Sequence, residues 1–478
     1  MASQTTAQDQ RPNIVFILTD QQRLDTINAL GHSHMETPNL DRLVRSGTSF
    51  SNMYVTAPSC APSRASLFSG TYPHTNGVLR NNEPWRWSWV SLLNQAGYRC
   101  VNVGKMHTNP HEERFGFHER HVVENKDRDH PTIPFYLDQW DKALWIRGRR
   151  KPSRVTYRAR EDYRECLGAF TWELEPDLHP DTFVGGMAEM WLDRYPGDEP
   201  FFLQIGFPGP HPPYDPTADY LETYVDRSLP EPIREGIADQ PEPLQKLRRR
   251  HMEEDHDAVV HLDNPTDAQM RRQRAHYYAN VSMIDAEVGR IMAALDRRGV
   301  LDNTIIIFTS DHGDCLNDHG HSQKWTMYEQ SVHVPAIVSG PGVARGERVD
   351  DLVSLMDLGP TILELAGLQP PGWMEARSLR GYLEGTEMEP RDCVFSEHAN
   401  DKLLQGTAFM TMIRKDRWKL VHFIDCPDGQ LFDLIADPRE TLNLWDDPEH
   451  RAIRDQLVAD ILNWRIESDR MTVGFPPR

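Results

Sequence analysis

The sequence contains little cysteine and no segment that could carry the chain across a membrane. Its six cysteines in 478 residues lie far apart and form no Cys-x-x-Cys pair, so a disulfide framework is not expected. No apolar run approaches the roughly 20 residues of a membrane span. Residues 1–10 are polar and lack the apolar core of a secretory signal. We therefore expect a cytoplasmic protein with no membrane partner.

Positive charge is also scarce. The chain has 52 Lys and Arg against 72 Asp and Glu, which gives a formal net charge of -20. The isoelectric point is near 5.5. An acidic surface disfavours nucleic acid as a partner, and an anionic small substrate would need basic side chains gathered locally. The charge does not distinguish a monomer from a homo-oligomer, so both stay open.

Apolar segments alternate with helical patterns over most of the chain. Residues 13–19, Asn-Ile-Val-Phe-Ile-Leu-Thr, are typical of a parallel strand buried on both faces. Further strands are expected at residues 98–103, 201–206, 303–309 and 334–339. Helices are expected at residues 38–46, 88–96, 181–195 and 275–298. This alternation predicts an α/β fold with a mostly parallel central sheet flanked by helices.

A smaller second unit is expected after the Pro- and Gly-containing stretch at residues 368–372. We place the large domain at residues 1–370 and a C-terminal α+β subdomain with a short antiparallel sheet at residues 371–478. Its strands are expected at 394–396, 408–413, 418–423 and 430–434, before a helix at 448–466. Two less regular stretches, about 124–178 and 226–267, are interpreted as insertions whose charge runs face solvent.

Reactive side chains follow four of the predicted strands. Ligands of open α/β sheets bind beyond the carboxyl ends of the strands, so we expect these side chains to share one edge. In chain order they are Asp20, Gln21, Lys105, His107, His211, Asp311, His312 and, in the next loop, Lys324.

Part of this set suits a divalent cation. Oxygen ligands favour Ca²⁺, whereas an imidazole shifts the preference toward Mn²⁺. The candidate ligands are Asp20, Gln21, Asp311 and His312; alternatively the acids cap helices and the imidazole is packed. The remaining residues supply positive charge and proton transfer for an anionic substrate, unless they are solvated lysines and interior histidines. They are Lys105, His107, His211 and Lys324.

The most informative motif is Cys-Ala-Pro-Ser-Arg at residues 60–64, followed by Ala-Ser-Leu-Phe-Ser-Gly. Pro62 suits the first turn of a helix, so Cys60 would lie beside free N–H groups that favour an anion. In isolation the motif also fits a reduced, buried cysteine before a surface helix. The pattern Cys-x-Pro-x-Arg resembles the signature of type I sulfatases, in which the cysteine is oxidised to formylglycine.

Nearly the whole chain resembles the type I sulfatases of the alkaline phosphatase-like superfamily, including its patterns at residues 417–422, 431–434 and 437–438. The resemblance implies that a formylglycine-generating enzyme converts Cys60 and that Arg64 holds the product. It implies one metal ion, Ca²⁺ or Mn²⁺, bound by the residue-60 oxygen and by Asp20, Gln21, Asp311 and His312. The implied substrate contacts come from Lys105, Lys324, His211 and, by its spacing from Cys60, Asn81.

The implied reaction is hydrolysis of a small organic sulfate ester to an alcohol and inorganic sulfate. The resemblance gives His107 a role on the formylglycine diol and has His211 protonate or stabilise the leaving oxygen. Gln21 and His312 resemble the choline-sulfatase and phosphonate monoester hydrolase branch, whereas Lys105 and His107 have the sulfatase form. A phosphonate monoester or phosphodiester hydrolase is therefore the alternative, and a non-catalytic binding protein is a third hypothesis.

Overall fold

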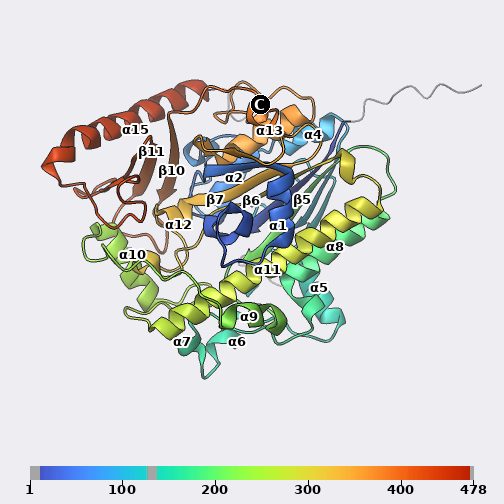
Figure 1. The fold of residues 1–478 in the computed structure, drawn as a ribbon, viewed down its shortest axis with the longest axis horizontal. Coiled ribbons are helices and arrows are strands. Elements are labelled where there is room, and N and C mark those ends of the chain that lie inside the picture. Colours follow the sequence, from blue (N-terminus) through green and yellow to red (C-terminus); the bar gives the residue numbers. More distant parts are fainter. Residues whose placement is uncertain (1–10, 125, 128–136, 474–478) are drawn as a thin grey trace, which may run out of the picture.

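The fold is built on one large sheet, seen in a computed structural model that describes residues 11–124, 126–127 and 137–473. Its nine strands follow the order β4-β3-β5-β1-β6-β7-β2-β8, and β9 pairs with β2 (Figure 1). The bounds are β1 (Asn13–Asp20), β2 (Gly47–Tyr54), β3 (Arg99–Gly104), β4 (Glu119–Val122), β5 (Phe201–Pro210), β6 (Thr304–Ser310), β7 (His333–Ser339), β8 (Glu347–Val349) and β9 (Val353–Ser354).

Helices cover both faces of this sheet, as an α/β fold requires. Their bounds are α1 (Pro38–Ser46), α2 (Cys60–Ser69), α3 (Pro73–Asn76), α4 (Val90–Gln95), α5 (Gln139–Ile146), α6 (Arg154–Arg158), α7 (Tyr163–Cys166), α8 (Pro180–Arg194), α9 (Ala218–Val225), α10 (Glu242–Glu253), α11 (Asp267–Arg297), α12 (Glu329–Val332), α13 (Leu358–Leu365), α14 (Arg380–Leu383) and α15 (Arg451–Met471). None of the helices in the described ranges has the length and apolar character that crossing a membrane demands.

The central strand β1 is apolar from Ile14 to Leu18 because both of its faces are buried. Phe16 and its neighbours two residues away face the core shared with α2, α4 and α13, whereas Val15 and Ile17 face the core shared with α1, α8 and α11. β1 pairs in parallel with β5 and β6. The prediction of a mostly parallel sheet flanked by helices is confirmed. β7, however, runs antiparallel to both of its neighbours.

Strand β2 is not predicted by the sequence analysis. It reads Gly-Thr-Ser-Phe-Ser-Asn-Met-Tyr, so it has neither a continuous apolar run nor strict alternation. Its polar side chains donate to backbone carbonyls beside them, for example Thr48 Oγ1 to the Ala344 oxygen and Ser49 Oγ to the Glu347 oxygen. Phe50, Met53 and Tyr54 join the core, and tertiary hydrogen bonds satisfy the polar side chains of this strand.

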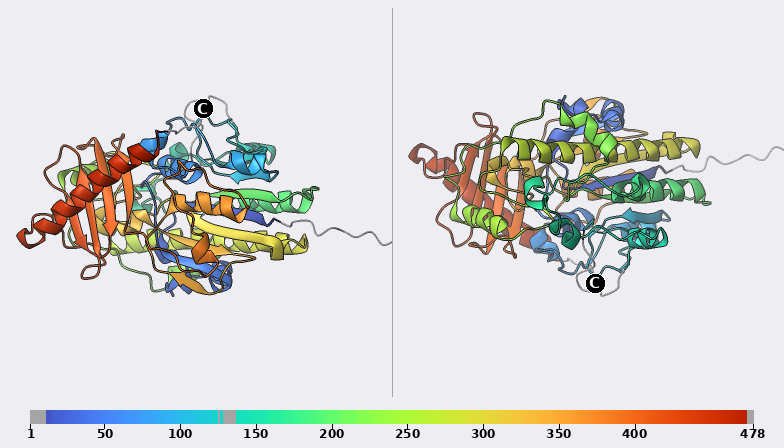
Figure 2. Two further views of the ribbon diagram at one scale, coloured as in Figure 1. Left: turned by 90° about the horizontal axis from the view of Figure 1, so that it is seen from above. Right: turned by 90° about the horizontal axis from the view of Figure 1, so that it is seen from below.

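The C-terminal part forms a second, antiparallel sheet of β10 (Cys393–Ala399), β11 (Phe409–Lys415), β12 (Trp418–Phe423) and β13 (Gln430–Asp433). Figure 2 shows this sheet and α15 at one end of the molecule. Phe395 stacks on Trp464 of α15 at 4.2 Å between ring centroids. Met410 and Met412 on the other face join the core of the main sheet. Both faces of the small sheet are thus buried.

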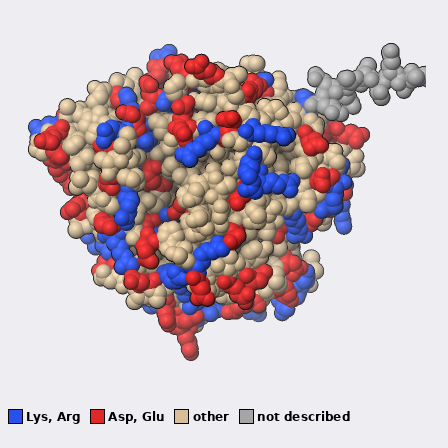
Figure 3. Space-filling view, viewed as in Figure 1, with Lys and Arg blue, Asp and Glu red and all other residues tan. Residues whose placement is uncertain are grey.

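The surface carries charges of both signs. On the face in Figure 3, basic and acidic side chains are interspersed. In the basic run at residues 147–150, the exposed Arg147 and Arg149 pair with Asp177 and Glu175. This part of the insertion is solvated, as expected.

Candidate active site

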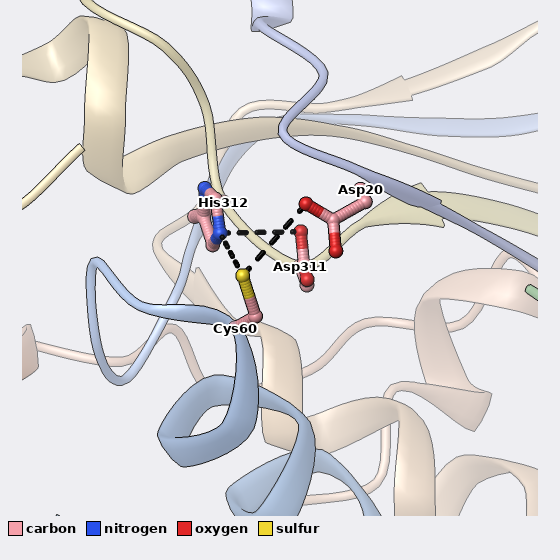
Figure 4. A group of neighbouring side chains, drawn as sticks. All are labelled: Asp20, Cys60, Asp311 and His312. Carbon is pink, nitrogen blue, oxygen red and sulfur yellow. Dashed lines mark hydrogen bonds and ion pairs between the residues drawn. The ribbon is translucent and has the colours of Figure 1, made fainter. Parts of the chain in front are cut away.

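The reactive residues gather where the central strands of the main sheet end. Asp20 is the last residue of β1, Lys105 follows β3, and Asp311 and His312 follow β6. Parallel strands β3, β5, β1 and β6 are adjacent in the sheet, so their carboxyl ends lie at one edge. Helix α2 brings Cys60 to the same place (Figure 4).

Cys60 is the first residue of α2, and all ten residues of that helix are buried. Its Sγ lies 3.0 Å from Lys324 Nζ and 3.1 Å from His312 Nε2. Burial and the Asp20 carboxylate oppose ionisation, but the surrounding cations outweigh them and hold the pKa of the Cys60 thiol below its ordinary value. Residue 60 is therefore set in surroundings that favour an anion.

Arg64, one turn further along α2, is fully buried and forms ion pairs with both Asp20 and Asp311. Its Nε donates to Asp311 Oδ2 at 2.7 Å, and a terminal nitrogen lies 3.2 Å from Asp20 Oδ2. Lys105 Nζ lies 2.7 Å from that same Asp20 oxygen. Burial opposes ionisation of Asp20, yet cations led by Lys105 lower the pKa of this carboxyl well below its usual range. The Asp20 carboxylate is thus kept ionised, as a metal ligand must be.

Four side chains form a group that could hold a metal ion: Asp20, Cys60, Asp311 and His312 each offer a ligand atom, and these atoms lie within 4.8 Å of one another. His312 Nδ1 lies 2.9 Å from the carbonyl oxygen of Gly313, so Nδ1 carries the proton. Its Nε2, facing Cys60, is then left with a lone pair for a cation. The donor set fits a divalent ion.

Gln21 is oriented by Asp314, a residue that the sequence analysis does not single out. Gln21 Nε2 donates to Asp314 Oδ2 at 2.7 Å, and Tyr214 donates its hydroxyl to the same oxygen. Because a carboxylate only accepts, the amide nitrogen must face Asp314, and Oε1 is turned to Lys324 Nζ at 2.9 Å. The amide oxygen of Gln21 is thereby presented on the side of residue 60.

Cys60 opens onto a cavity of about 430 Å³. The predicted residues Asn81, Lys105, His107, His211 and Lys324 line it. Asn81 Oδ1 accepts from the backbone N–H of Ala61 at 3.1 Å, which fixes this amide beside the start of α2. The backbone N–H of His107 donates to the Glu124 carboxylate at 3.1 Å. All substrate-side candidates therefore surround one space.

His211 lies against the cavity with both ring nitrogens near acceptors. Its Nδ1 is 2.8 Å from the carbonyl oxygen of Pro212, and its Nε2 is 3.5 Å from Asp257 Oδ2. Burial and the nearby Lys324 ammonium lower the pKa of His211 to about 4, although the Asp257 and Asp20 carboxylates act in the opposite direction. The ring is therefore mostly neutral at pH 7, and the two carboxylates raise the fraction that is charged.

Other parts of the cavity wall were missed. They come from distant segments: Arg80, Asn82, His256, Asp257, Trp325, Asp401, Lys402 and Leu403. Asp257, just beyond the charge run at residues 253–255, is 4% exposed and was not predicted as a site residue. A His-Asp pair directly after that acidic run is the only local signal. Trp85 and Trp140 are buried in the core and Trp145 is 78% exposed, so none of these three lines the cavity.

Comparisons with known proteins agree with this site. Residues 12–368 match the sulfatase family, and residues 317–467 match the C-terminal region of N-sulphoglucosamine sulphohydrolase. An arylsulfatase of Clostridium perfringens is 32% identical over 463 residues, covering 94% of this chain and 93% of that protein. A choline-sulfatase of Rhizobium meliloti is 30% identical over 464 residues, covering 94% and 85%.

Among solved structures, the phosphonate monoester hydrolase of Agrobacterium radiobacter superposes with a TM-score of 0.81 at 27% identity, covering 96% of both chains. Both the sequence match over three quarters of the chain and the fold lead to one assignment. The chain belongs to the sulfatase family of the alkaline phosphatase-like superfamily, and it is a sulfuric ester hydrolase.

Proposed function

We propose that this protein hydrolyses a small organic sulfate ester with a formylglycine at position 60 and one divalent ion, Ca²⁺ or Mn²⁺. The observation that carries the proposal is the position of Cys60 Sγ. It lies 3.0 Å from Lys324 Nζ, opens onto the cavity, and is one of four grouped ligand atoms. The maturation enzyme and a cytoplasmic location belong to the same proposal.

The residues around position 60 have two roles: one group would bind the cation, and the other would contact the ester. The cation would be held by Asp20, Gln21, Asp311, His312 and residue 60, and it supplies Lewis-acid charge to the reacting oxygens. A formylglycine hydrate at position 60 would supply two hydroxyls, one as the nucleophile toward sulfur and one whose deprotonation would expel sulfate and restore the aldehyde. Arg64 orients both acids by its contacts with Asp20 and Asp311.

On the substrate side, the two ammonium groups of Lys105 and Lys324 bind sulfate oxygens, and Asn81 adds amide N–H donors. A single such donor is worth about 2.7–4 kcal/mol where charge develops in a dry site. His211 gives the departing oxygen its proton, and His107 takes a proton at residue 60 in the second half of the reaction. Both imidazoles line the same cavity as the sulfur atom.

A phosphonate monoester or phosphodiester hydrolase remains the second candidate. The TM-score of 0.81 with a phosphonate monoester hydrolase favours it, together with the Gln21 and His312 forms of the ligand set. Comparing kcat/KM for 4-nitrophenyl sulfate with that for 4-nitrophenyl phenylphosphonate distinguishes the two. A ratio in favour of the sulfate supports the primary proposal, and a ratio in favour of the phosphonate replaces it.

The chemical state of residue 60 is tested by the mass of the tryptic peptide spanning residues 46–64, from protein produced with a formylglycine-generating enzyme. A peptide lighter than the thiol form, reactive toward a hydrazide, is the expected result. The variant C60A should lack both the aldehyde and turnover while it unfolds at the temperature of the parent. Turnover by C60A would rule out a formylglycine nucleophile.

A further inference from the structure

The two insertions converge on His211 through a single buried carboxylate, Asp257. This residue lies in the stretch 226–267, and its Oδ2 is 3.5 Å from His211 Nε2. Its other oxygen pairs with a guanidinium nitrogen of Arg154, which comes from the stretch 124–178. Arg154 is itself fixed by a second ion pair with Asp127 at 2.9 Å. The Asp257 oxygen that does not contact His211 is therefore held by a fixed ion pair with Arg154.

The backbone at Asp257 is held in an uncommon conformation. Asp257 and Ala258 both have positive φ angles, 52° and 56°, a region that non-glycine residues rarely adopt. Such conformations persist where the surroundings determine them, and they concentrate at functional sites. Ala258 is fully buried in a cluster with Tyr157 and Phe170 of the other insertion. Packing therefore fixes the direction in which Asp257 points.

The charges around Asp257 keep it ionised. Burial opposes ionisation, but His256 at 3.1 Å, together with Arg154 and His211, lowers the pKa of Asp257 well below its usual range. A carboxylate this acidic does not take a proton from a neighbouring imidazole. It can instead stabilise the charged form of that imidazole and fix its orientation.

The acceptors on both sides of His211 define which atoms carry protons in the charged form of the ring. The Pro212 carbonyl oxygen only accepts, so it requires a proton on Nδ1. Asp257 likewise favours a proton on Nε2, yet the 3.5 Å separation is too long for a full hydrogen bond. Nε2 therefore keeps only a long contact with Asp257, while His211 itself lines the cavity.

We infer that Asp257 is a positioning residue for the departure of the alcohol: it orients His211 Nε2–H toward the leaving oxygen and stabilises the charged ring until the proton moves. This inference rests on the proposed function. As the bond between sulfur and the alcohol oxygen breaks, its electron pair passes to that oxygen, which takes the Nε2 proton. The ring becomes neutral, keeps Nδ1–H on Pro212, and is reprotonated from the acidic species of the bulk solvent after the alcohol has left.

The role predicts an effect that depends on the leaving group. A good leaving group such as 4-nitrophenolate departs without a proton, whereas an alkoxide requires one. The variant D257N should lower kcat/KM for an alkyl sulfate by about 100-fold, within the range for general acid catalysis. For 4-nitrophenyl sulfate it should lower kcat/KM by less than about 3-fold on the same reasoning. A merely structural defect would lower both to the same extent.

Two control variants make the measurement specific. Asp255, two residues away, pairs with Arg164 and does not line the cavity, so D255N should leave both rates unchanged. H211Q should reproduce the pattern of D257N, and the double variant H211Q/D257N should show no further loss. Equal losses for the two esters, or additive losses in the double variant, would overturn the inference.

A second readout does not depend on turnover. The ¹⁵N resonances of His211, assigned by their absence in H211Q, are followed against pH in [¹⁵N]histidine-labelled protein kept in Ca²⁺. Lys324, Asp20 and Asp257 act on this ring, and only the last is altered in D257N. The pKa of His211 should fall in D257N and stay unchanged in D255N. An unchanged His211 pKa in D257N would rule out the pairing of Asp257 with His211, whether or not any sulfate ester is cleaved. If the pKa shifts as expected but the wild type cleaves no sulfate ester, only the proposed function is refuted.

Discussion

Removal of the Arg64 guanidinium should lower the free energy of unfolding. The size of the loss can be estimated from the contacts of this side chain. Arg64, Asp20 and Asp311 each have side chains with no solvent exposure. The variant R64Q leaves Asp311 without its guanidinium partner, because a glutamine is neutral and too short to reach both acids. Breaking a buried ion pair on one side costs about 3–5 kcal/mol, since the remaining charge stays buried.

Urea unfolding in EDTA, followed by tryptophan fluorescence, measures this cost. R147Q provides the matched control, because Arg147 and Asp177 form a pair whose side chains are 49% and 58% exposed. Such surface pairs contribute about 0–1 kcal/mol. Added Ca²⁺ should stabilise R64Q relative to the same variant in EDTA, because a bound ion compensates the two carboxylates and contributes about 2.7 kcal/mol at 100 times its Kd. A loss below about 1 kcal/mol in EDTA would refute the argument.

Three further changes test the ligand set and one buried acid. D311N should lose cation affinity by calorimetry and turnover together, and normal metal content with full activity would contradict its ligand role. D314N lets the Gln21 amide reverse, since an amide both donates and accepts, so cation affinity should fall about 10–100-fold; unchanged affinity would exclude this orienting contact. Burial raises the pKa of Glu287 to about 7, above its ordinary 4.5, so the folded state binds a proton that the unfolded chain releases. Wild type should therefore lose stability relative to E287Q as pH rises between these two values, by no more than about 3 kcal/mol, and parallel stability curves would contradict the assignment.

The sequence predicts the centre of the fold better than its edges. β1 is apolar on both faces because helices cover both sides of it, and that requirement is visible in five consecutive residues, Ile14 to Leu18. β2 is stabilised by hydrogen bonds to residues almost 300 positions away, which no local pattern reveals. The direction of β7 is likewise fixed by its partners, since an apolar run has no polarity of its own.

The active site shows the same contrast between residues that the local sequence predicts and residues that only distant packing brings into place. Asp20, Lys105, Asp311 and His312 could be predicted to meet because the ends of adjacent parallel strands meet. Asp257 reaches the cavity from a charged stretch whose composition is that of a solvated surface, and only the packing of two insertions turns it inward. The orientation of the Gln21 amide depends on Asp314, almost 300 residues later in the chain.

The burial of α2 determines whether another molecule can reach Cys60 before or after folding. Cys60 is 1% exposed, and its neighbours Ala61 and Arg64 are equally enclosed, so only a molecule small enough to enter the cavity can reach the sulfur once folding is complete. If Cys60 is oxidised by an enzyme as proposed, an enzyme that binds several residues around the thiol would need the nascent or unfolded chain. A molecule that folded first would then keep its thiol. The active fraction of a preparation would depend on the relative rates of oxidation and folding, and slower folding would raise it.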